Sequence, residues 1–256
     1  MKYRVLGNLQ FYNAAVPDFR WGAPHMKPTP LRPSVSGSEG GVGLDAWFHT
    51  TRFLTTCATL DQLPDLGVPE VAFVGRSNAG KSTCLNILAQ QRQLAFASKR
   101  PGRTQHINLF VLGKHGQTDA VLTDLPGYGY AAVGRDDKRR WQQVMANYLV
   151  SRHALTGIVC LVDSRLGLTE LDQILLELVA PRVAEGLKFL ILLTKADKLS
   201  KAERSKALSI AKLHAAGGDA ALFSALSHEG VAQLRGRLAN WCGFSTSTDD
   251  ALGSQG

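Results

Sequence analysis

The stretch from residue 71 to residue 82 constrains the fold more than any other part of the chain. An apolar run, VAFVG, leads directly into GRSNAGKS, so that Gly75 to Ser82 match the pattern G-x-x-x-x-G-K-[ST]. In this pattern a β-strand is followed by a phosphate-binding loop and the start of a helix. The glycines let backbone N–H groups close around phosphate, and the helix N-terminus adds positive potential. The segment therefore predicts an α/β fold with a nucleotide-phosphate site.

Short apolar runs and amphipathic stretches alternate after this point, which is typical of a largely parallel sheet with helices on both faces. We expect strands at 71–75, 107–113, 120–125, 157–163, 188–194 and 220–225. We expect helices at 82–91, 136–153, 169–184, 201–215 and 229–242. Only the second and third strands lack a helix between them, so they are predicted to form an antiparallel pair at the edge of a six-stranded sheet.

The two ends of the chain differ in composition from this core. Residues 1–45 contain five prolines and the stretch SVSGSEGGVG, which cannot bury enough apolar surface to order itself. Residues 244–256 are similarly polar. In a chain of 256 residues with 45% hydrophobic residues, we expect one domain at 46–243 between two disordered tails.

Cysteine spacing and hydropathy bear on the location of the protein. The four cysteines lie far apart without the spacing of zinc ligands, which predicts buried, reduced thiols. Polar residues interrupt the apolar stretch that a signal peptide needs at the N-terminus, and no later run reaches about 18 apolar residues. We therefore expect a cytoplasmic protein with no membrane partner. The formal charge of +8 favours an acidic partner, although solubility alone explains it equally well.

Further residues extend the phosphate site toward a bound cation. Lys81 is suited to neutralise the β and γ oxygens of a nucleotide, and the Ser82 hydroxyl to reach Mg²⁺. The segment Asp124-Leu-Pro-Gly127 ends the third predicted strand, at the sheet edge where doubly wound folds bind ligands. There Asp124 can hold Mg²⁺ through water, and the Gly127 N–H can meet the γ-phosphate. A lone D-x-x-G is also a common turn, so its position after the phosphate loop gives it weight.

The segment that closes the fifth predicted strand, Thr194-Lys195-Ala196-Asp197, indicates which base is bound. Guanine presents two donors on its Watson–Crick edge, and the carboxylate of Asp197 can accept both, whereas adenine would leave it mismatched. The stem of Lys195 can lie over the base and sugar. After the sixth strand, the amides of Phe223-Ser224-Ala225 are expected where guanine O6 would lie. In isolation, an Asp after a strand is as often a cap as a base reader.

A polar loop precedes the second predicted strand. It reads Pro101-Gly102-Arg103-Thr104-Gln105, and Thr104 is suited to cap Mg²⁺ when the γ-phosphate is present. We interpret this loop as a nucleotide-dependent switch.

These elements, in this order, resemble the translation-factor-related GTPases. Within that class, GRSNAGKS, PGRTQ, DLPGYGYA, TKADKL and FSAL are similar to the EngB family of bacterial ribosome-biogenesis GTPases, over about residues 46–243. The resemblance implies a P-loop GTPase fold and a slow GTPase. It also implies a role in large ribosomal subunit assembly, with loss affecting cell division and septation.

The resemblance assigns the nucleotide site residue by residue. The implied nucleotide-binding residues are Gly75, Arg76, Ser77, Asn78, Ala79, Gly80, Lys81, Ser82, Thr83, Gly102, Arg103, Thr104, Gln105, His106, Asp124, Leu125, Pro126, Gly127, Thr194, Lys195, Ala196, Asp197, Phe223, Ser224 and Ala225. The implied Mg²⁺ residues are Ser82, Thr104 and Asp124. His106 departs from the aliphatic residue that is usual there, which matters little for a backbone contact.

The hydrolytic residues show one departure from other GTPases. Tyr128 follows Gly127, where many GTPases carry a water-orienting Gln, so slow unassisted hydrolysis is expected. Asn78 in the phosphate loop is a candidate K⁺ ligand that offsets charge in the transition state, or else a residue that tolerates a tight turn. The candidate catalytic residues are Lys81, Thr104, Gly127 and Asn78.

Two basic clusters flank the predicted switches. One comprises Arg135, Lys138, Arg139 and Arg140 with Trp141, and the other comprises Arg92, Lys99, Arg100 and Arg103. Such clusters are either solvated helix faces or contacts to RNA phosphates. The partner expected from the resemblance is the large ribosomal subunit or its precursor, bound by a monomer.

Three other functions were weighed against this one. A P-loop ATPase or small-molecule kinase has no use for Asp197. An RNA-binding module with negligible hydrolysis is disfavoured by the intact Lys81, Ser82, Thr104 and Asp124. A regulatory GTPase with a non-ribosomal partner stays open.

Overall fold

The computed structural model describes residues 43–95, 106–114, 116–129 and 135–244, with the side chains of 135–142 excepted. The chain divides into the units Met1–Pro30 and Leu31–Gly256, and all described residues belong to the second. Its strands are β1 (Arg52–Cys57), β2 (Glu70–Gly75), β3 (Ile107–Leu112), β4 (Ala120–Asp124), β5 (Leu155–Asp163), β6 (Lys188–Thr194) and β7 (Asp219–Leu222). Its α-helices are α2 (Leu44–His49), α3 (Lys81–Leu88), α4 (Arg135–Ser151), α5 (Glu170–Ala184), α6 (Lys201–His214) and α7 (Val231–Trp241). Two short 3-10 helices, η1 (Leu60–Gln62) and η2 (Ala196–Lys198), complete these elements.

The described strands form one sheet in the order β1-β3-β4-β2-β5-β6-β7. Strands β2, β4, β5, β6 and β7 are parallel, and β3 is antiparallel to both β4 and β1. The predicted mostly parallel α/β fold with an antiparallel β3/β4 pair is confirmed. The sheet has seven strands rather than six, because β1 adds to β3, so the antiparallel pair does not lie at the edge.

Strand β1 escaped the sequence analysis for a physical reason. Its segment, RFLTTC, has no buried apolar run, and Phe53 and Leu54 are both exposed. A change of register between Phe53 and Thr55 interrupts its pairing with β3. An edge strand with a bulge lacks the alternation that marks a half-buried strand.

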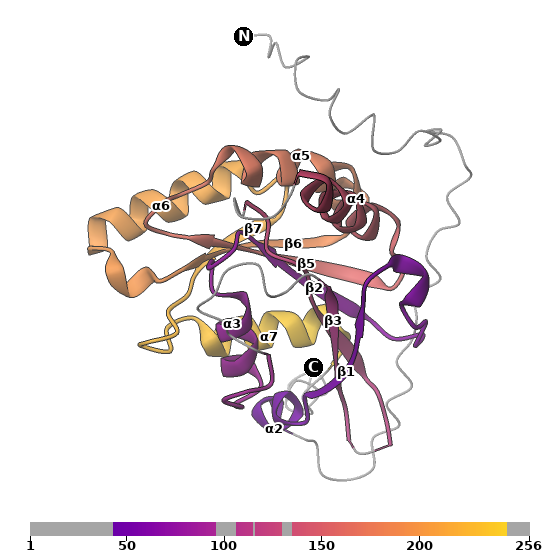
Figure 1. Ribbon diagram of the computed structural model, residues 1–256. Coiled ribbons are helices and arrows are strands. Elements are labelled where there is room, and N and C mark those ends of the chain that lie inside the picture. Colours follow the sequence, from indigo (N-terminus) through magenta and orange to yellow (C-terminus); the bar gives the residue numbers. More distant parts are fainter. Residues whose placement is uncertain (1–42, 96–105, 115, 130–134, 245–256) are drawn as a thin grey trace, which may run out of the picture. The chain divides into compact units, whose positions relative to one another are not determined.

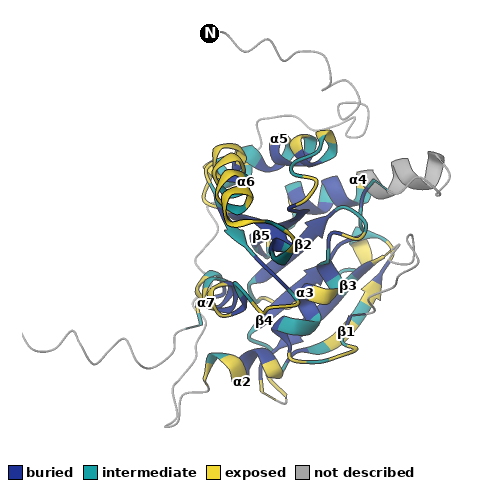
Figure 2. Cartoon of the chain, turned by 90° about the vertical axis from the view of Figure 1, so that its left-hand side faces the viewer, coloured by how far each residue is buried: buried dark blue, intermediate teal, exposed yellow. Residues whose placement is uncertain are grey.

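The helices cover both faces of the sheet, as predicted (Figure 1). On one face, α4, α5 and α6 pack on residues such as Ile158, Cys160 and Val162 of β5. On the other face, α2, α3 and α7 pack on the alternate residues Val159 and Leu161. Figure 2 shows the central strands buried between the layers and much of α6 exposed. This alternation makes β5 apolar throughout, which is why its sequence reads as one continuous run.

Helix α2 begins at Leu44, near the predicted domain boundary at residue 46. Trp47 and Phe48 on this helix are buried, and the ring of Trp47 stacks on that of Phe244 at 4.4 Å between centroids. Residues near both predicted boundaries therefore pack together, while the boundaries themselves stay a prediction. All four cysteines are free and buried, as expected.

Arg235 on α7 fixes the helix that follows the phosphate loop. Its guanidinium donates to the carbonyls of Ile87 and Leu88 at 2.9 and 2.8 Å, and forms an ion pair with Asp45 at 2.7 Å. The side chain is only 6% exposed. A buried cation thus satisfies the last carbonyls of α3 and links that helix to α2 and α7.

Glu70 anchors α4 at the opposite end of the sheet from the phosphate loop. This buried carboxylate accepts hydrogen bonds from Thr123 on β4 and from Tyr148 on α4, and pairs with Arg152 at 2.9 Å. The C-terminal end of α4 is therefore held to β2 and β4 by charged and polar contacts.

Candidate nucleotide site

The phosphate loop begins where β2 ends, at Gly75. A Cβ there would lie 2.5 Å from the carbonyl oxygen of Leu161, so the backbones of β2 and β5 approach too closely for any side chain. The loop closes with Ala79 N–H donating to Arg76 O at 3.0 Å. Gly80, with φ 101°, then caps α3. The chain turns sharply at the two glycines that the pattern requires, and α3 starts at the loop.

Lys81 lies beneath this loop. Its side chain is buried, and its Nζ donates to Gly75 O at 3.3 Å. A Cβ on Gly127 would lie 3.1 Å from this Nζ and 3.0 Å from Ser77 N, so the Gly127 backbone lies directly against the loop. Burial lowers the pKa of Lys81, while Asp124 opposes the shift. The structure therefore brings together the phosphate loop, Lys81 and Gly127, as the sequence predicted.

Asp124 ends β4 opposite Phe73 of β2 in the parallel register. It is 2% exposed, and its Oδ1 has no hydrogen-bond partner among the described residues. Burial raises its pKa to about 6, against the effect of Lys81. A buried carboxylate oxygen without a donor, near the half-buried Ser82 at the start of α3, suits a hard divalent cation that takes oxygen ligands.

Tyr128 does not take the place of the water-orienting Gln. Its ring is in the core beneath α5, and its hydroxyl donates to Asp172 at 2.6 Å. Burial, followed by the neighbouring Cys160 and Asp172, raises the pKa of Tyr128. The side chain is therefore a neutral core residue, which sequence reasoning had not anticipated.

The base-reading segment follows β6, and η2 contains its last two residues. Thr194 Oγ1 donates to Ala79 O at 2.7 Å, which ties this segment to the phosphate loop. Asp197 Oδ1 accepts from Ser224 Oγ at 2.7 Å, and Ala196 N–H donates to Phe223 O at 3.1 Å. The hydrogen bond from Ser224, more than that from Lys198, lowers the pKa of Asp197 and keeps it an acceptor.

The tripeptide Phe223-Ser224-Ala225 needs one correction. The Phe223 amide donates to Leu193 O at 2.9 Å and the Ser224 amide to Glu229 O at 3.0 Å. These two amides are therefore committed within the protein and not offered to guanine O6. Within the described part of the chain, the amide of Ala225 has no such acceptor. The side chain of Ser224 has the more direct role, because it holds Asp197.

Asp163 is a polar residue of this site that the sequence analysis missed. Its Oδ2 lies 2.7 Å from Lys195 Nζ, which also donates to Asn78 O at 3.1 Å. Asp163 ends β5 opposite Thr194, and an Asp at the carboxyl end of a parallel strand is the signal that could have revealed it. Although burial opposes it, hydrogen bonds from Arg165 and Lys195 hold the pKa of Asp163 low. The ionised Asp163 thus clamps Lys195 across the phosphate loop.

Comparison with known proteins identifies this arrangement. A family model described as "50S ribosome-binding GTPase" matches residues 70–195. A probable GTP-binding protein EngB from Acidovorax ebreus (strain TPSY) is 69% identical over 195 residues, which cover 76% of this chain and 89% of the relative. The chain belongs to the EngB family of GTP-binding proteins.

Solved structures agree at the level of the fold. A crystal structure of a probable GTP-binding protein EngB superposes with a TM-score of 0.54 at 17% identity, covering 69% of this chain and 100% of that one. Era in complex with MgGDPNP and nucleotides 1506–1542 of 16S ribosomal RNA gives a TM-score of 0.54 at 22% identity, covering 68% and 56%. With the EngB relatives, they establish a guanine-nucleotide-binding P-loop GTPase, and hence an enzyme that hydrolyses GTP.

Some EngB-like features predicted from the sequence lie outside the described residues. They are Gly102, Arg103, Thr104 and Gln105 of the first switch, the basic residues Lys99 and Arg100, and the side chains of Arg135, Lys138, Arg139, Arg140 and Trp141. His106, just before β3, is exposed. No helix in the described ranges has the length and hydropathy needed to cross a membrane.

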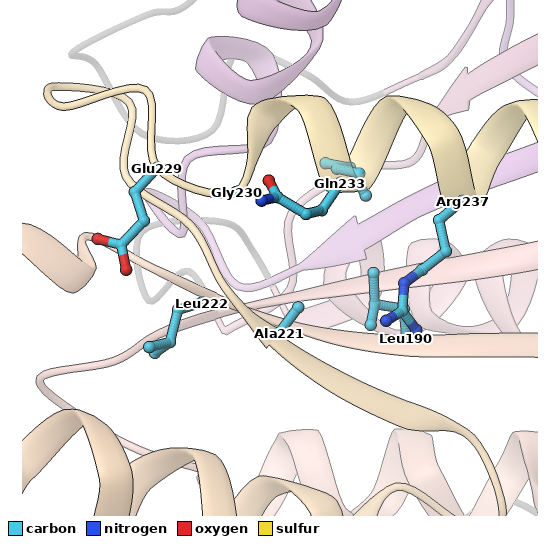
Figure 3. A pocket seen from close by; sticks show the side chains of 8 residues that line it. Leu190, Ala221, Leu222, Glu229, Gly230, Gln233 and Arg237 are labelled. Carbon is cyan, nitrogen blue, oxygen red and sulfur yellow. The ribbon is translucent and has the colours of Figure 1, made fainter.

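A separate hollow lies between β6, β7 and α7, behind the loop of Ser224 (Figure 3). Its volume is about 240 Å³, and Leu190, Ala221 and Leu222 form its apolar floor. The charged residues at its rim are already paired, Glu229 with Arg204 and Arg237 with Asp219. The hollow therefore offers no free charge for a ligand, and the nucleotide site is the one built around the phosphate loop.

Proposed function

We propose that this GTPase is a nucleotide-dependent switch in the assembly of the large ribosomal subunit, and that normal cell division and septation depend on it. The observation that carries the proposal is the 69% identity to an EngB protein across the nucleotide site. The family model's description as a 50S ribosome-binding GTPase and the formal charge of +8 support an rRNA-containing partner. The RNA-bound Era structure shows that a protein of this fold can bind ribosomal RNA.

The nucleotide is proposed to lie along the carboxyl edge of the sheet. Residues 75–83 would bind its phosphates, Asp197 would accept the guanine N1 and N2 donors, and Lys195 would cover the base and sugar. Ala225 would supply the amide at O6. The links from Thr194 and Lys195 to the phosphate loop fix the distance between base and phosphate subsites, which favours one rigid nucleotide conformation.

Mg²⁺ is proposed to be held by Ser82 and Thr104, with Asp124 reaching it directly or through water. The partnerless Oδ1 of Asp124 is the feature of the described site that fits this ion. When bound, the ion would neutralise charge on the β and γ phosphate oxygens. The protein's own contribution is a dry pocket in which Lys81 and the Gly127 amide face the same phosphate.

The switch is proposed to present a phosphate-binding surface to RNA. Thr104 and Gly127 would meet the γ-phosphate, and the basic residues of 92–103 and 135–140 adjoin these two positions in the sequence. The GTP form would therefore bind the large subunit or its precursor, and the GDP form would bind weakly. Contacts to phosphates make such binding weaker as salt rises.

Cosedimentation with purified large subunits tests the switch. The protein loaded with a non-hydrolysable GTP analogue should pellet with the subunits, whereas the GDP-loaded protein should stay largely in the supernatant. Arg139→Ala/Arg140→Ala should reduce pelleting and flatten its salt dependence by about two charges. The matched control is Lys201→Ala/Lys206→Ala, which removes two exposed charges from α6 and should pellet like wild type. Equal pelleting in both nucleotide states would refute the switch.

A further inference from the structure

Tyr128 connects the nucleotide site to α5 through a buried hydrogen bond. The residue directly follows Gly127, yet its ring is 8% exposed and packs in the core shared by β5, α4 and α5. Its hydroxyl donates to Asp172 Oδ1 at 2.6 Å and lies 3.8 Å from Cys160 Sγ. A buried phenol bonded to a carboxylate makes a charge-assisted contact, which is stronger and more directional than a neutral one.

Asp172 is itself rigidly placed. It is 1% exposed, and its Oδ2 accepts from Thr169 N at 2.7 Å and from Thr169 Oγ1 at 2.6 Å, forming the capping box of α5. No lysine or arginine of the described chain forms an ion pair with it. Its charge is balanced by neutral donors and by the N-terminus of α5. One oxygen of Asp172 therefore caps the helix, and the other is left for Tyr128.

The main chain of Tyr128 transmits this position to the phosphate loop. Ser77 N–H donates to Tyr128 O at 2.9 Å, and Arg76 forms a parallel bridge with Tyr128. The backbone of Gly127 is so close to the loop that an added Cβ would lie 3.0 Å from Ser77 N. Tyr128 is thus fixed at both ends, by α5 through its hydroxyl and by the loop through its carbonyl.

We propose that Asp172 is a positioning residue for the γ-phosphate, acting through Tyr128 to hold the Gly127 amide against the phosphate loop. The side chain at the usual place of the catalytic Gln then serves to set the backbone rather than to orient water. The inference rests on the proposed role of Gly127 at the γ-phosphate. Because GDP has no such phosphate, the contact should matter for GTP and very little for GDP.

Tyr128→Phe tests the contact, since it deletes only the hydroxyl. Dissociation constants are measured by calorimetry for GDP and for the imido analogue of GTP, both with Mg²⁺. The affinity for the analogue should fall about tenfold, as expected for loss of a hydrogen bond to a charged group, while the GDP affinity changes less than about twofold. Single-turnover hydrolysis should slow by a similar factor.

Tyr148→Phe is the matched control. Tyr148 is also a fully buried tyrosine whose hydroxyl donates to a buried carboxylate, Glu70, but at the opposite end of β2 from the phosphate loop. Both variants should unfold at lower denaturant concentration, but only Tyr128→Phe should change the ratio of analogue to GDP affinity. Asp172→Asn, which keeps the shape and one acceptor oxygen, should change that ratio in the same direction and less.

Three outcomes separate the possibilities. An unchanged ratio in Tyr128→Phe, or the same change in Tyr148→Phe, would overturn the positioning role. Tighter analogue binding by Tyr128→Phe would also overturn it, because the hydrogen bond would then oppose the GTP-bound arrangement. If wild type itself does not distinguish the analogue from GDP while Gly127→Ala also leaves both affinities unchanged, the failure lies in the role of Gly127.

Discussion

Single side chains in this protein have pKa values and partners that define their chemistry. Asp197 is held as an acceptor by Ser224, whereas Asp124 is buried with a bare oxygen and a pKa raised to about 6. The first arrangement suits recognition of a base with two donors. The second makes a carboxylate that favours protonation until a cation compensates its charge.

Asp197→Asn should change the base that is bound. The new amide presents a donor where guanine N1 and N2 also present donors, so GTP should weaken by at least about a hundredfold. Xanthosine triphosphate offers an acceptor at that edge and should bind better to the variant than GTP does. Competition between the two nucleotides in equilibrium binding measures the preference. Full guanine selectivity in the variant would show that Asp197 does not read the base.

Asp124 should make the stability of the nucleotide-free protein depend on pH. Its folded pKa of about 6 lies above the ordinary value of 3.8, so the folded state binds the proton more tightly than the unfolded state. Its contribution to stability is therefore present at low pH and is lost as pH rises through about 6. The unfolding free energy of wild type minus that of Asp124→Asn should fall by about 1 kcal/mol between pH 5 and pH 7.5. Urea titrations of both proteins at these pH values measure it; a difference that rises with pH would contradict it.

At the scale of helices and strands, buried charged groups determine how the layers are joined around the site. Arg235 joins α7 to the end of α3, and Glu70 joins α4 to the start of β2. The phosphate loop lies at the other end of both α3 and β2. The elements that carry the loop are therefore fixed at their far ends, which limits the motion of the loop itself.

Arg235→Met should destabilise the folded protein by about 3 kcal/mol, because it leaves two α3 carbonyls buried without donors. Arg237→Met, two residues further along α7, is the matched control. Arg237 pairs with Asp219 at 2.6 Å, but both side chains are about 40% exposed, so its loss should cost under about 1 kcal/mol. Denaturant unfolding of the three proteins gives both values. Equal losses would mean that the α3 cap contributes no more than a surface ion pair.

For the whole molecule, the sequence predicted those parts of the site that depend on local pattern. Gly75 to Ser82, Asp124 to Gly127 and Thr194 to Asp197 were found because each follows an apolar strand with a fixed spacing. Asp163, Asp172 and the inward direction of Tyr128 were missed because they depend on contacts between segments far apart in the chain, such as Tyr128 with α5. Strand β1 was missed because it is stabilised by pairing with β3 rather than by its own hydropathy.

The isolated protein should hydrolyse GTP slowly, at about 10⁻³ per second or below. The reason is now structural, because Tyr128 is buried and bonded to Asp172, so it cannot orient an attacking water. We propose that K⁺ supplies part of the missing charge. Asn78 is exposed in the phosphate loop with φ 65°, and its side chain makes no hydrogen bond among the described residues. A cation ligated there would offset negative charge as it develops on the transferring phosphate.

Turnover should therefore be faster in K⁺ than in Na⁺ at equal ionic strength, by about tenfold. Asn78→Ala should remove this difference while leaving GDP affinity near that of wild type, because Lys195 bonds the Asn78 carbonyl rather than its side chain. Phosphate release from the wild type and the variant, in both salts, measures the effect. Equal rates of wild type in the two salts would exclude K⁺ as the missing charge, and the low basal rate would then require a group supplied by the partner.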